Sequence, residues 1–176
     1  MGVLEYSILA IVGVGAGFIN VLAGGGSLLT VPAMVLMGVP GPVANGTNRI
    51  AIVAQAFTAI LTFFRRGYYD LKLSASLAAS LLPGAAIGAY FGTQIEGLMF
   101  NRLVAAIMIA VMIVSLTESR FKKNDQLIAP TLSPRQRQYL THGLIALIGF
   151  YGGLIHIGIG FLVMPILHRV GGIDVN

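Results

Sequence analysis

Two glycine breaks in apolar sequence constrain this chain more than any other feature. The first break reads AGGGSLLTVP over residues 23–32, and the second reads IHIGIGFLVMP over residues 155–165. Unwound backbone leaves N–H and C=O groups without partners, and hydrocarbon tolerates such groups only where they line a cavity or bind a ligand. Paired breaks at corresponding positions are typical of transporters whose site lies where the helices are interrupted.

The composition places the chain in a lipid bilayer. Of its 176 residues, 56% are hydrophobic and 10% are charged, and the mean hydropathy is +0.87. A soluble domain of this length cannot bury so much apolar surface. The chain has no cysteine, which excludes disulfides, thiol catalysis and thiolate metal sites. Its net charge of +5 is spread over loops between apolar stretches, which argues against nucleic-acid binding.

The lengths of the apolar stretches predict an all-α, polytopic transmembrane protein. The stretches cover residues 3–22, 27–38, 43–64, 71–92, 98–116, 140–155 and 158–170. A span needs about 20 residues, so the second and the last stretch are too short to cross alone. We therefore predict two glycine-broken helical hairpins, over residues 3–38 and 140–170. The alternative is that each hairpin is a pair of complete, tilted spans. Such a pair would also bring the chain back to the side of the membrane from which it entered.

The order of the spans predicts two inverted repeats. Three full spans separate the hairpins, and an odd number makes the second hairpin enter from the opposite side of the membrane. The expected units are a first repeat over residues 1–118, a basic linker over 119–138 and the start of a second, incomplete repeat over 139–176. Asn124, Asp125, Pro130 and Pro134 are expected to break any helix in the linker.

The loop charges indicate the orientation. One side carries Arg65, Arg66, Lys72, Arg120, Lys122, Lys123, Arg135, Arg137 and Arg169. The other side carries Arg102 beside Glu5 and Glu96. The positive-inside rule then puts the N-terminus outside and the loops 65–72 and 119–138 in the cytoplasm.

The breaks themselves are candidate ligand sites. The glycines of the first break let backbone N–H groups converge, and a helix starting just after them presents its positive end to an anion. The serine there would be both helix cap and ligand. The alternative is that the glycines permit only a tight turn and close helix packing. The residues concerned are Gly24, Gly25, Gly26 and Ser27 in the first break, and Gly158 and Gly160 in the second.

Further polar side chains are expected to face the same pathway, because polar groups at membrane depth are otherwise costly. They are Asn45, Thr47, Asn48 and Arg49 at the start of the third stretch, and Asn20 and Gln55, which lie deeper. Three alternatives stay open. Asn45 could cap its helix, Arg49 could snorkel to the outer headgroups, and Asn20 or Gln55 could make an ordinary interhelical hydrogen bond.

His156 lies where the second hairpin approaches its turn. It could donate a hydrogen bond to a substrate or change protonation during transport. The alternative is a structural donor within the helical bundle. His168 and Arg169 are expected at the cytoplasmic boundary, and His142 at the interface.

The positions of the acidic residues predict a small anionic substrate. Glu5, Asp70, Glu96 and Glu118 all lie at the ends of stretches or in loops, whereas cation transporters and proton relays place Asp or Glu inside the membrane. No nucleophile, base and orienting acid can be assembled, so we expect neither an enzyme nor a cofactor. One alternative is a metal-cation permease that depends on His156. The other is a membrane subunit that binds a partner and transports nothing.

Three motifs in order carry a family resemblance: GFINVLAGGGSLLTVP from Gly17, VANGTNRIAI from Val43 and GFYGGLIHIGIGFLVMP from Gly149. Over nearly the whole chain they resemble the TauE/SafE sulfite exporter family of permeases. The resemblance implies an all-helical carrier of the inner membrane that moves sulfite, sulfonates or related organosulfur anions. By position it places the family's glycine-rich and AxGT-like boxes on Gly24, Gly25, Gly26, Asn45, Gly46, Thr47, Asn48, Gly158 and Gly160.

The chain departs from the family pattern in two ways. Ile157 and Ile159 alternate with the glycines of the second break, which lacks three glycines in a row, so its turn is expected to be less open than the first. Family members also have about as many spans after the second hairpin as after the first, which predicts a C-terminally truncated member. In that case a second chain, as in a homo-oligomer, would shelter the second hairpin. The leading hypothesis is a secondary carrier whose hairpin tips form a midplane site.

Overall fold

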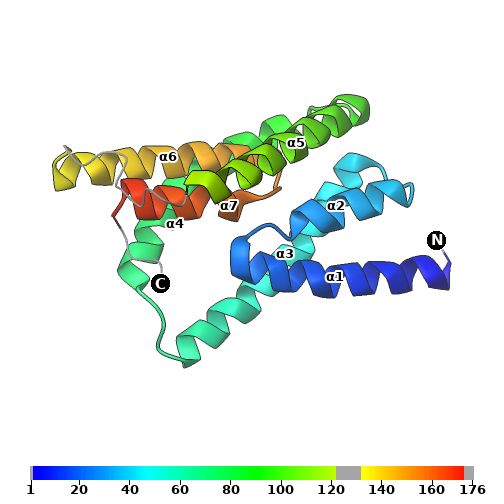
Figure 1. The fold of residues 1–176 in the computed structure, drawn as a ribbon, viewed down its shortest axis with the longest axis horizontal. Coiled ribbons are helices and arrows are strands. Elements are labelled where there is room, and N and C mark those ends of the chain that lie inside the picture. Colours follow the sequence, from blue (N-terminus) through cyan, green and yellow to red (C-terminus); the bar gives the residue numbers. More distant parts are fainter. Residues whose placement is uncertain (1, 122–131, 173–176) are drawn as a thin grey trace.

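A computed structural model describes residues 2–121 and 132–172 of the chain (Figure 1). The described part is helical, as predicted. Its elements are α1 (Val3–Ala23), α2 (Ser27–Leu36), α3 (Gly41–Arg65), α4 (Leu71–Gly92), α5 (Gly97–Phe121), α6 (Pro134–Leu154), α7 (Ile159–Pro165) and the π-helix η1 (Ile166–Val170). The linker residues Lys122, Lys123, Asn124, Asp125 and Pro130 lie outside the described residues.

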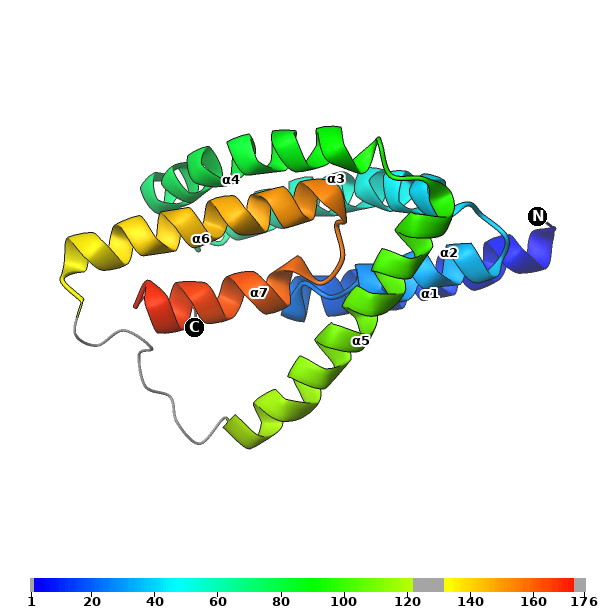
Figure 2. The same ribbon diagram turned by 90° about the horizontal axis from the view of Figure 1, so that it is seen from above.

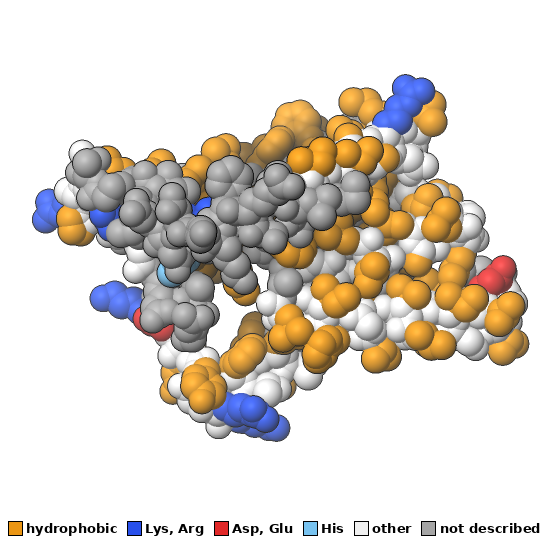
Figure 3. All heavy atoms as spheres, viewed as in Figure 1, with side chains coloured by type: hydrophobic (Ala, Val, Ile, Leu, Met, Phe, Trp, Pro, Cys, Tyr) orange, Lys and Arg blue, Asp and Glu red, His pale blue; other side chains and the backbone are white. Residues whose placement is uncertain are grey.

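The surface of the molecule is that of a membrane protein. Among the described residues, three helices are long and apolar enough to cross a bilayer: α1 over Val3–Leu22, α3 and α4. Large hydrophobic side chains point outward along these helices; Val53 is 70% exposed, for example, and Tyr90 is 67% exposed. Figure 3 shows hydrophobic side chains over the helices and Lys and Arg side chains near their ends. Apolar sides and basic ends suit a bilayer and its headgroups.

Local sequence signals explain where the helices begin. The Asp70 side chain accepts a hydrogen bond from Leu73 N at 2.9 Å and caps α4. Ser133 and Gln136 form a capping box at the start of α6. Pro134 does not break this helix, contrary to our expectation. It is the first residue of α6, where its missing N–H costs nothing and its fixed φ suits the helix. Helices therefore cover both ends of the predicted linker.

The two hairpins approach each other from opposite ends of the molecule. In Figure 2, α1 and α2 lead from the N-terminal end to a tip near the middle, and α6 and α7 lead to a tip from the other end. The turns fall at the predicted glycines, since α1 ends at Ala23 and α6 ends at Leu154. This arrangement is the one that inverted repeats would give. The division of the chain into such repeats remains a prediction.

The most extensive helix contact joins α4 and α6, which run parallel (Figure 2). A Cβ atom added at Gly84 or Gly88 would collide with the backbone of α6, and one added at Gly149 or Gly153 would collide with the backbone of α4. Small residues at a spacing of four let helix backbones approach closely in membranes. Because the helices are parallel, their N-termini lie at the same end of the molecule. The side of the membrane that this end faces remains a prediction.

The buried core gathers around the second break. Ile155 and Ile157 have no exposed surface and pack with side chains from three other helices. Those side chains are Val31 and Met34 of α2, Ala44 of α3, and Phe100 and Val104 of α5. Close van der Waals packing of these side chains holds the second break against the first half of the chain.

A bulky residue between α4 and α6 should separate them. Gly88→Leu places a side chain where the Phe150 carbonyl lies, and overpacking costs about 1–3 kcal/mol or more when backbone must move. We expect a lower melting temperature by fluorescence-detected size exclusion. Gly143→Leu is the matched control, because a Cβ atom at exposed Gly143 of α6 meets nothing within 4 Å. Equal stability of the two variants would show that the glycine contact contributes nothing.

Candidate functional site

The tips of the two hairpins meet through their backbones. Gly24 ends α1 in the left-handed conformation at φ 67°, and Gly158 precedes α7 at φ 66°. Side chains disfavour this conformation, which explains a glycine at both positions. The Gly160 N–H donates to the Gly24 carbonyl, with 3.4 Å between N and O. A Cβ atom on Gly24 would collide with the Gly160 backbone, so the contact requires glycine on the first tip.

Asn20 accepts hydrogen bonds from two backbone N–H groups of the first break. Its backbone carbonyl accepts from Gly24 N at 2.8 Å, and its Oδ1 accepts from Gly26 N at 3.3 Å. Two of the glycine N–H groups that we expected to hold an anion therefore bind Asn20. The prediction that Ser27 caps the next helix is also wrong. Gly26 is the N-cap, and Ser27 is the first residue of α2.

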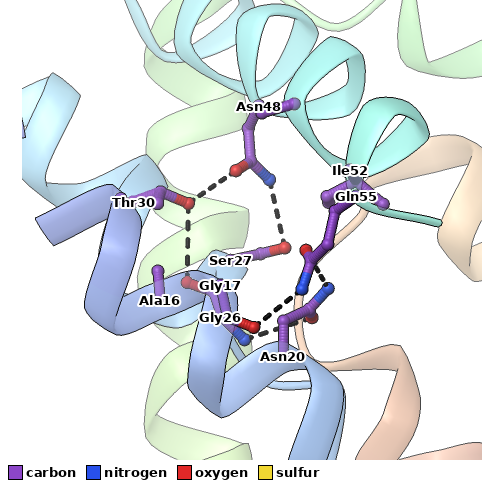
Figure 4. Close-up of a pocket in the computed structure, with 11 residues that line it drawn as sticks. Ala16, Gly17, Asn20, Gly26, Ser27, Thr30, Asn48, Ile52 and Gln55 are labelled. Carbon is purple, nitrogen blue, oxygen red and sulfur yellow. Dashed lines mark hydrogen bonds between the residues drawn. The ribbon is translucent and has the colours of Figure 1, made fainter. Parts of the chain in front are cut away.

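Polar side chains of α1, α2 and α3 converge beside this break (Figure 4). Asn20 Nδ2 donates to Gln55 Oε1 at 2.9 Å, and Gln55 Nε2 donates to the Gly17 carbonyl at 2.7 Å. These bonds tie α1 to α3. The interhelical hydrogen bond named above as an alternative for Asn20 and Gln55 is thus present, in residues that also line a pocket.

A second chain of hydrogen bonds ties α2 to α3. Asn48 Nδ2 donates to Ser27 Oγ at 3.0 Å, and the Thr30 hydroxyl donates to Asn48 Oδ1 (Figure 4). Ser27 is 3% exposed and Asn48 is 4% exposed. Buried polar groups are costly without partners, and here they satisfy one another.

The two groups line one pocket with a volume of about 160 Å³. Its lining consists of Gly13, Ala16, Gly17, Asn20, Gly26, Ser27, Thr30, Asn48, Ala51, Ile52 and Gln55. None of these residues is charged. Each amide NH₂ group uses one hydrogen in the bonds above and keeps a second, and the Ser27 hydroxyl accepts from Asn48 without donating to a described residue. Four donors on lining residues therefore have no partner among the described residues.

Arg49 reaches the other hairpin rather than this pocket. Its Nη2 contacts the carbonyls of Gly152, Gly153 and Leu154, at 3.5 Å for Gly152 and 3.3 Å for Leu154. These carbonyls form the C-terminus of α6, where a cation stabilises the helix dipole by up to about 2 kcal/mol when partly buried. The Arg49 side chain is thus held by the end of α6, while its depth in the membrane remains a prediction.

The second break is held by Tyr151. Its hydroxyl donates to the Ile157 carbonyl at 2.6 Å, and Ile157 N donates to the Ile155 carbonyl at 3.0 Å. His156 is half-buried between these isoleucines. A Cβ atom on Gly152 would lie 3.9 Å from His156 Nδ1, so the imidazole lies against the last turn of α6.

The structure divides the predicted site residues into groups. Asn20, Gly26, Ser27, Asn48 and Gln55 line the pocket. Gly24 and Gly160 form the contact between the tips, Gly25 lies against the Phe161 ring, and Gly158 makes the left-handed turn before α7. Arg49 and His156 lie at the end of α6.

Asn45 and Thr47 belong to none of these groups. Asn45 does not cap α3, which begins four residues earlier, at Gly41; it is buried, and its Oδ1 has no partner among the described residues. The Thr47 side chain is exposed.

Sequence reasoning missed Thr30 and Tyr151. Thr30 follows Ser27 by three residues and so lies on the same face of α2, a spacing that could have identified it. Tyr151 gave no such signal, because its partner is a backbone carbonyl beyond the end of its helix. No group of three or more metal-binding side chains occurs in the part of the chain that the structure describes.

Comparison with known proteins identifies relatives. The sequence profile described as Sulfite exporter TauE/SafE matches residues 9–176. The chain is 31% identical over 151 residues to a "Probable membrane transporter protein ORF9" of Sinorhizobium sp, covering 85% of this chain and 55% of that protein. It is 29% identical over 166 residues to a probable membrane transporter protein of Haemophilus influenzae, covering 93% of this chain and 62% of that protein.

A further relative is the probable membrane transporter protein YfcA of Escherichia coli, which is 28% identical over 153 residues. The match covers 85% of this chain and 54% of YfcA. The chain therefore spans somewhat more than half the length of these curated relatives. No solved structure matches it.

A side chain on the first tip should open the contact between the hairpins. Gly25→Val would collide with the Phe161 ring, which lies over Gly25. The expected overpacking of about 1–3 kcal/mol should raise deuterium uptake in residues 158–162. Phe161→Ala in the same chain should restore protection by making room. Gly15→Val is the control, since a Cβ atom at Gly15 meets nothing within 4 Å. Unchanged exchange in Gly25→Val would contradict the contact.

Loss of one hydroxyl should loosen the second break. Tyr151→Phe leaves the Ile157 carbonyl without its donor, at a cost of about 1–3 kcal/mol. Amide exchange over residues 155–160 should accelerate by about tenfold. Tyr139→Phe on the same helix is the control, because Tyr139 is 78% exposed. Equal exchange in both variants would assign the stability of the break to apolar packing alone.

Proposed function

We propose that this chain, which belongs to the sulfite exporter TauE/SafE family, forms the substrate-binding part of a secondary carrier for a small oxyanion. Sulfite, a sulfonate or a related organosulfur anion is the substrate class that we infer. The observation that carries the proposal is the uncharged pocket beside the first break. There, four hydrogen-bond donors lie inside an apolar helical bundle.

The chemistry of the lining favours an anion over a cation. An oxyanion is bound by N–H and O–H donors aimed at its oxygens, and the pocket has donors from Asn20, Ser27, Asn48 and Gln55 but no carboxylate. The pocket also borders the N-terminus of α2, where the helix dipole is positive. A metal cation would instead need acidic or histidine ligands.

The size of the pocket favours a small substrate. A volume of about 160 Å³ is below the range of roughly 300–1,000 Å³ that holds drug-sized molecules. A sulfite ion or a short sulfonate is compatible with this space. A nucleotide or a sugar would require a larger pocket volume.

The arrangement of the hairpins supports alternating access. The tips approach from opposite ends and touch at Gly24 and Gly160. Relative rocking of two units around such a contact would expose the pocket first to one side and then to the other. We propose residues 1–118 and 139–176 as parts of two inverted repeats joined by the linker 119–138.

The proposal also covers the membrane that holds the carrier and its orientation there. We place it in the inner membrane, with the N-terminus outside and the loops 65–72 and 119–138 in the cytoplasm, from the distribution of basic residues. A homo-oligomer remains a prediction.

An isosteric change at the pocket tests this proposal. Asn48→Asp removes the donor to Ser27 and adds a negative charge within the pocket. Sulfite or sulfonate uptake into proteoliposomes should fall by at least about tenfold, because a like charge opposes the anion. Thr58→Ala is the matched control on α3, since Thr58 is exposed and bonds only the Ala54 carbonyl of its own helix.

Each other outcome has a defined meaning. Unchanged anion uptake in Asn48→Asp would place the substrate outside this pocket. Uptake of a divalent cation, retained or increased in Asn48→Asp, would favour a metal-cation permease. Absence of any flux in correctly inserted wild-type protein would favour the non-transporting subunit.

A further inference from the structure

Two adjacent residues of α3 contact the two hairpins separately. Asn48 bonds Ser27 and Thr30 in the first hairpin, and Arg49 bonds the end of α6 in the second. Consecutive residues on an α-helix point about 100° apart, so one turn of α3 can serve both neighbours. One turn of α3 therefore connects the pocket, through Asn48, with the second break, through Arg49.

The Arg49 contact lies directly before the second break. The carbonyls that it binds belong to Gly152, Gly153 and Leu154, and the backbone leaves the helical path at Ile155. The segment that follows brings Gly160 onto Gly24. A cation at the end of α6 thus fixes the position from which the second tip departs.

The environment of Arg49 is unusual for a charged group inside a membrane protein. Its Nε is buried without a partner among the described residues, and its Nη2 contacts only carbonyl dipoles in the bonds above. Burying part of a charged group is costly unless hydrogen bonds compensate for the lost solvation. A purely packing role would be served as well by an apolar side chain of similar volume.

We propose that Arg49 is a positioning residue of the carrier, which clamps the C-terminus of α6 and holds the second tip on the first without touching the substrate. This inference rests on the proposed function. Arg49 does not line the pocket, so it acts on the conformational step of transport rather than on binding. This role differs from the substrate contact that the sequence alone suggests for Arg49.

The kinetic test separates binding from the conformational step. In proteoliposomes, Arg49→Met should lower maximal anion uptake by about tenfold or more and leave KM within about threefold, because the pocket is intact. Arg49→Lys keeps the charge but loses the planar fork, and it should restore part of the uptake. Arg65→Met is the matched control, since Arg65 is an exposed arginine at the far end of the same helix.

A second readout does not depend on transport. The chain has no cysteine, so Ile157→Cys introduces a single thiol at a position with no exposed surface. A maleimide should not label this thiol in the otherwise unchanged chain, should label it when Arg49→Met is added, and should label it less when Arg49→Lys is added. If Arg49→Met fails to insert, the same comparison is made between Arg49→Lys and the unchanged chain.

The outcomes distinguish this inference from the proposed function. A rise in KM of tenfold or more with maximal uptake retained would make Arg49 a substrate ligand and overturn the clamp. Equal labelling with and without Arg49→Met would also overturn it. If wild-type protein carries no anion but the labelling follows the expected order, the proposed function fails while the clamp on α6 stands.

Discussion

The hydrogen bond from Gly160 N to the Gly24 carbonyl is the contact around which the described structure is organised. It joins two helix breaks that lie far apart in sequence, and it requires backbone-to-backbone approach, which a side chain on Gly24 would prevent. In hydrocarbon, each of these polar groups would be costly without a partner. The contact therefore pairs one polar group of each break with the other and holds the two hairpin tips together.

Other interactions hold the breaks in position from outside. Asn20 binds the first break through its backbone and its side chain, and Tyr151 binds the second through its hydroxyl. Ile155 and Ile157 bury the second break among α2, α3 and α5. The first break is thus held by polar groups, and the second by polar groups together with apolar packing.

The glycines of the chain have two different structural roles. Those at 24, 158 and 160 allow a turn and a close contact between tips, whereas those at 84, 88, 149 and 153 bring α4 and α6 together. The first group is recognisable from its cluster within apolar sequence. The second follows the four-residue spacing of helix packing in membranes, but the spacing does not name the partner helix.

The sequence by itself determined the class of fold and the positions of the breaks, because hydropathy and glycine clusters act over a few neighbouring residues. It also identified Asn20 and Gln55 as polar groups that lie deeper than the interface, and Ser27 and Asn48 as candidate ligands near the first break. Only the tertiary structure shows that these four residues line one pocket and that Arg49 contacts the other hairpin. Asn48 and Arg49 are adjacent in sequence, and their separate roles depend on which helix packs against each face of α3. That packing is set by contacts across more than a hundred residues, which local sequence patterns do not specify.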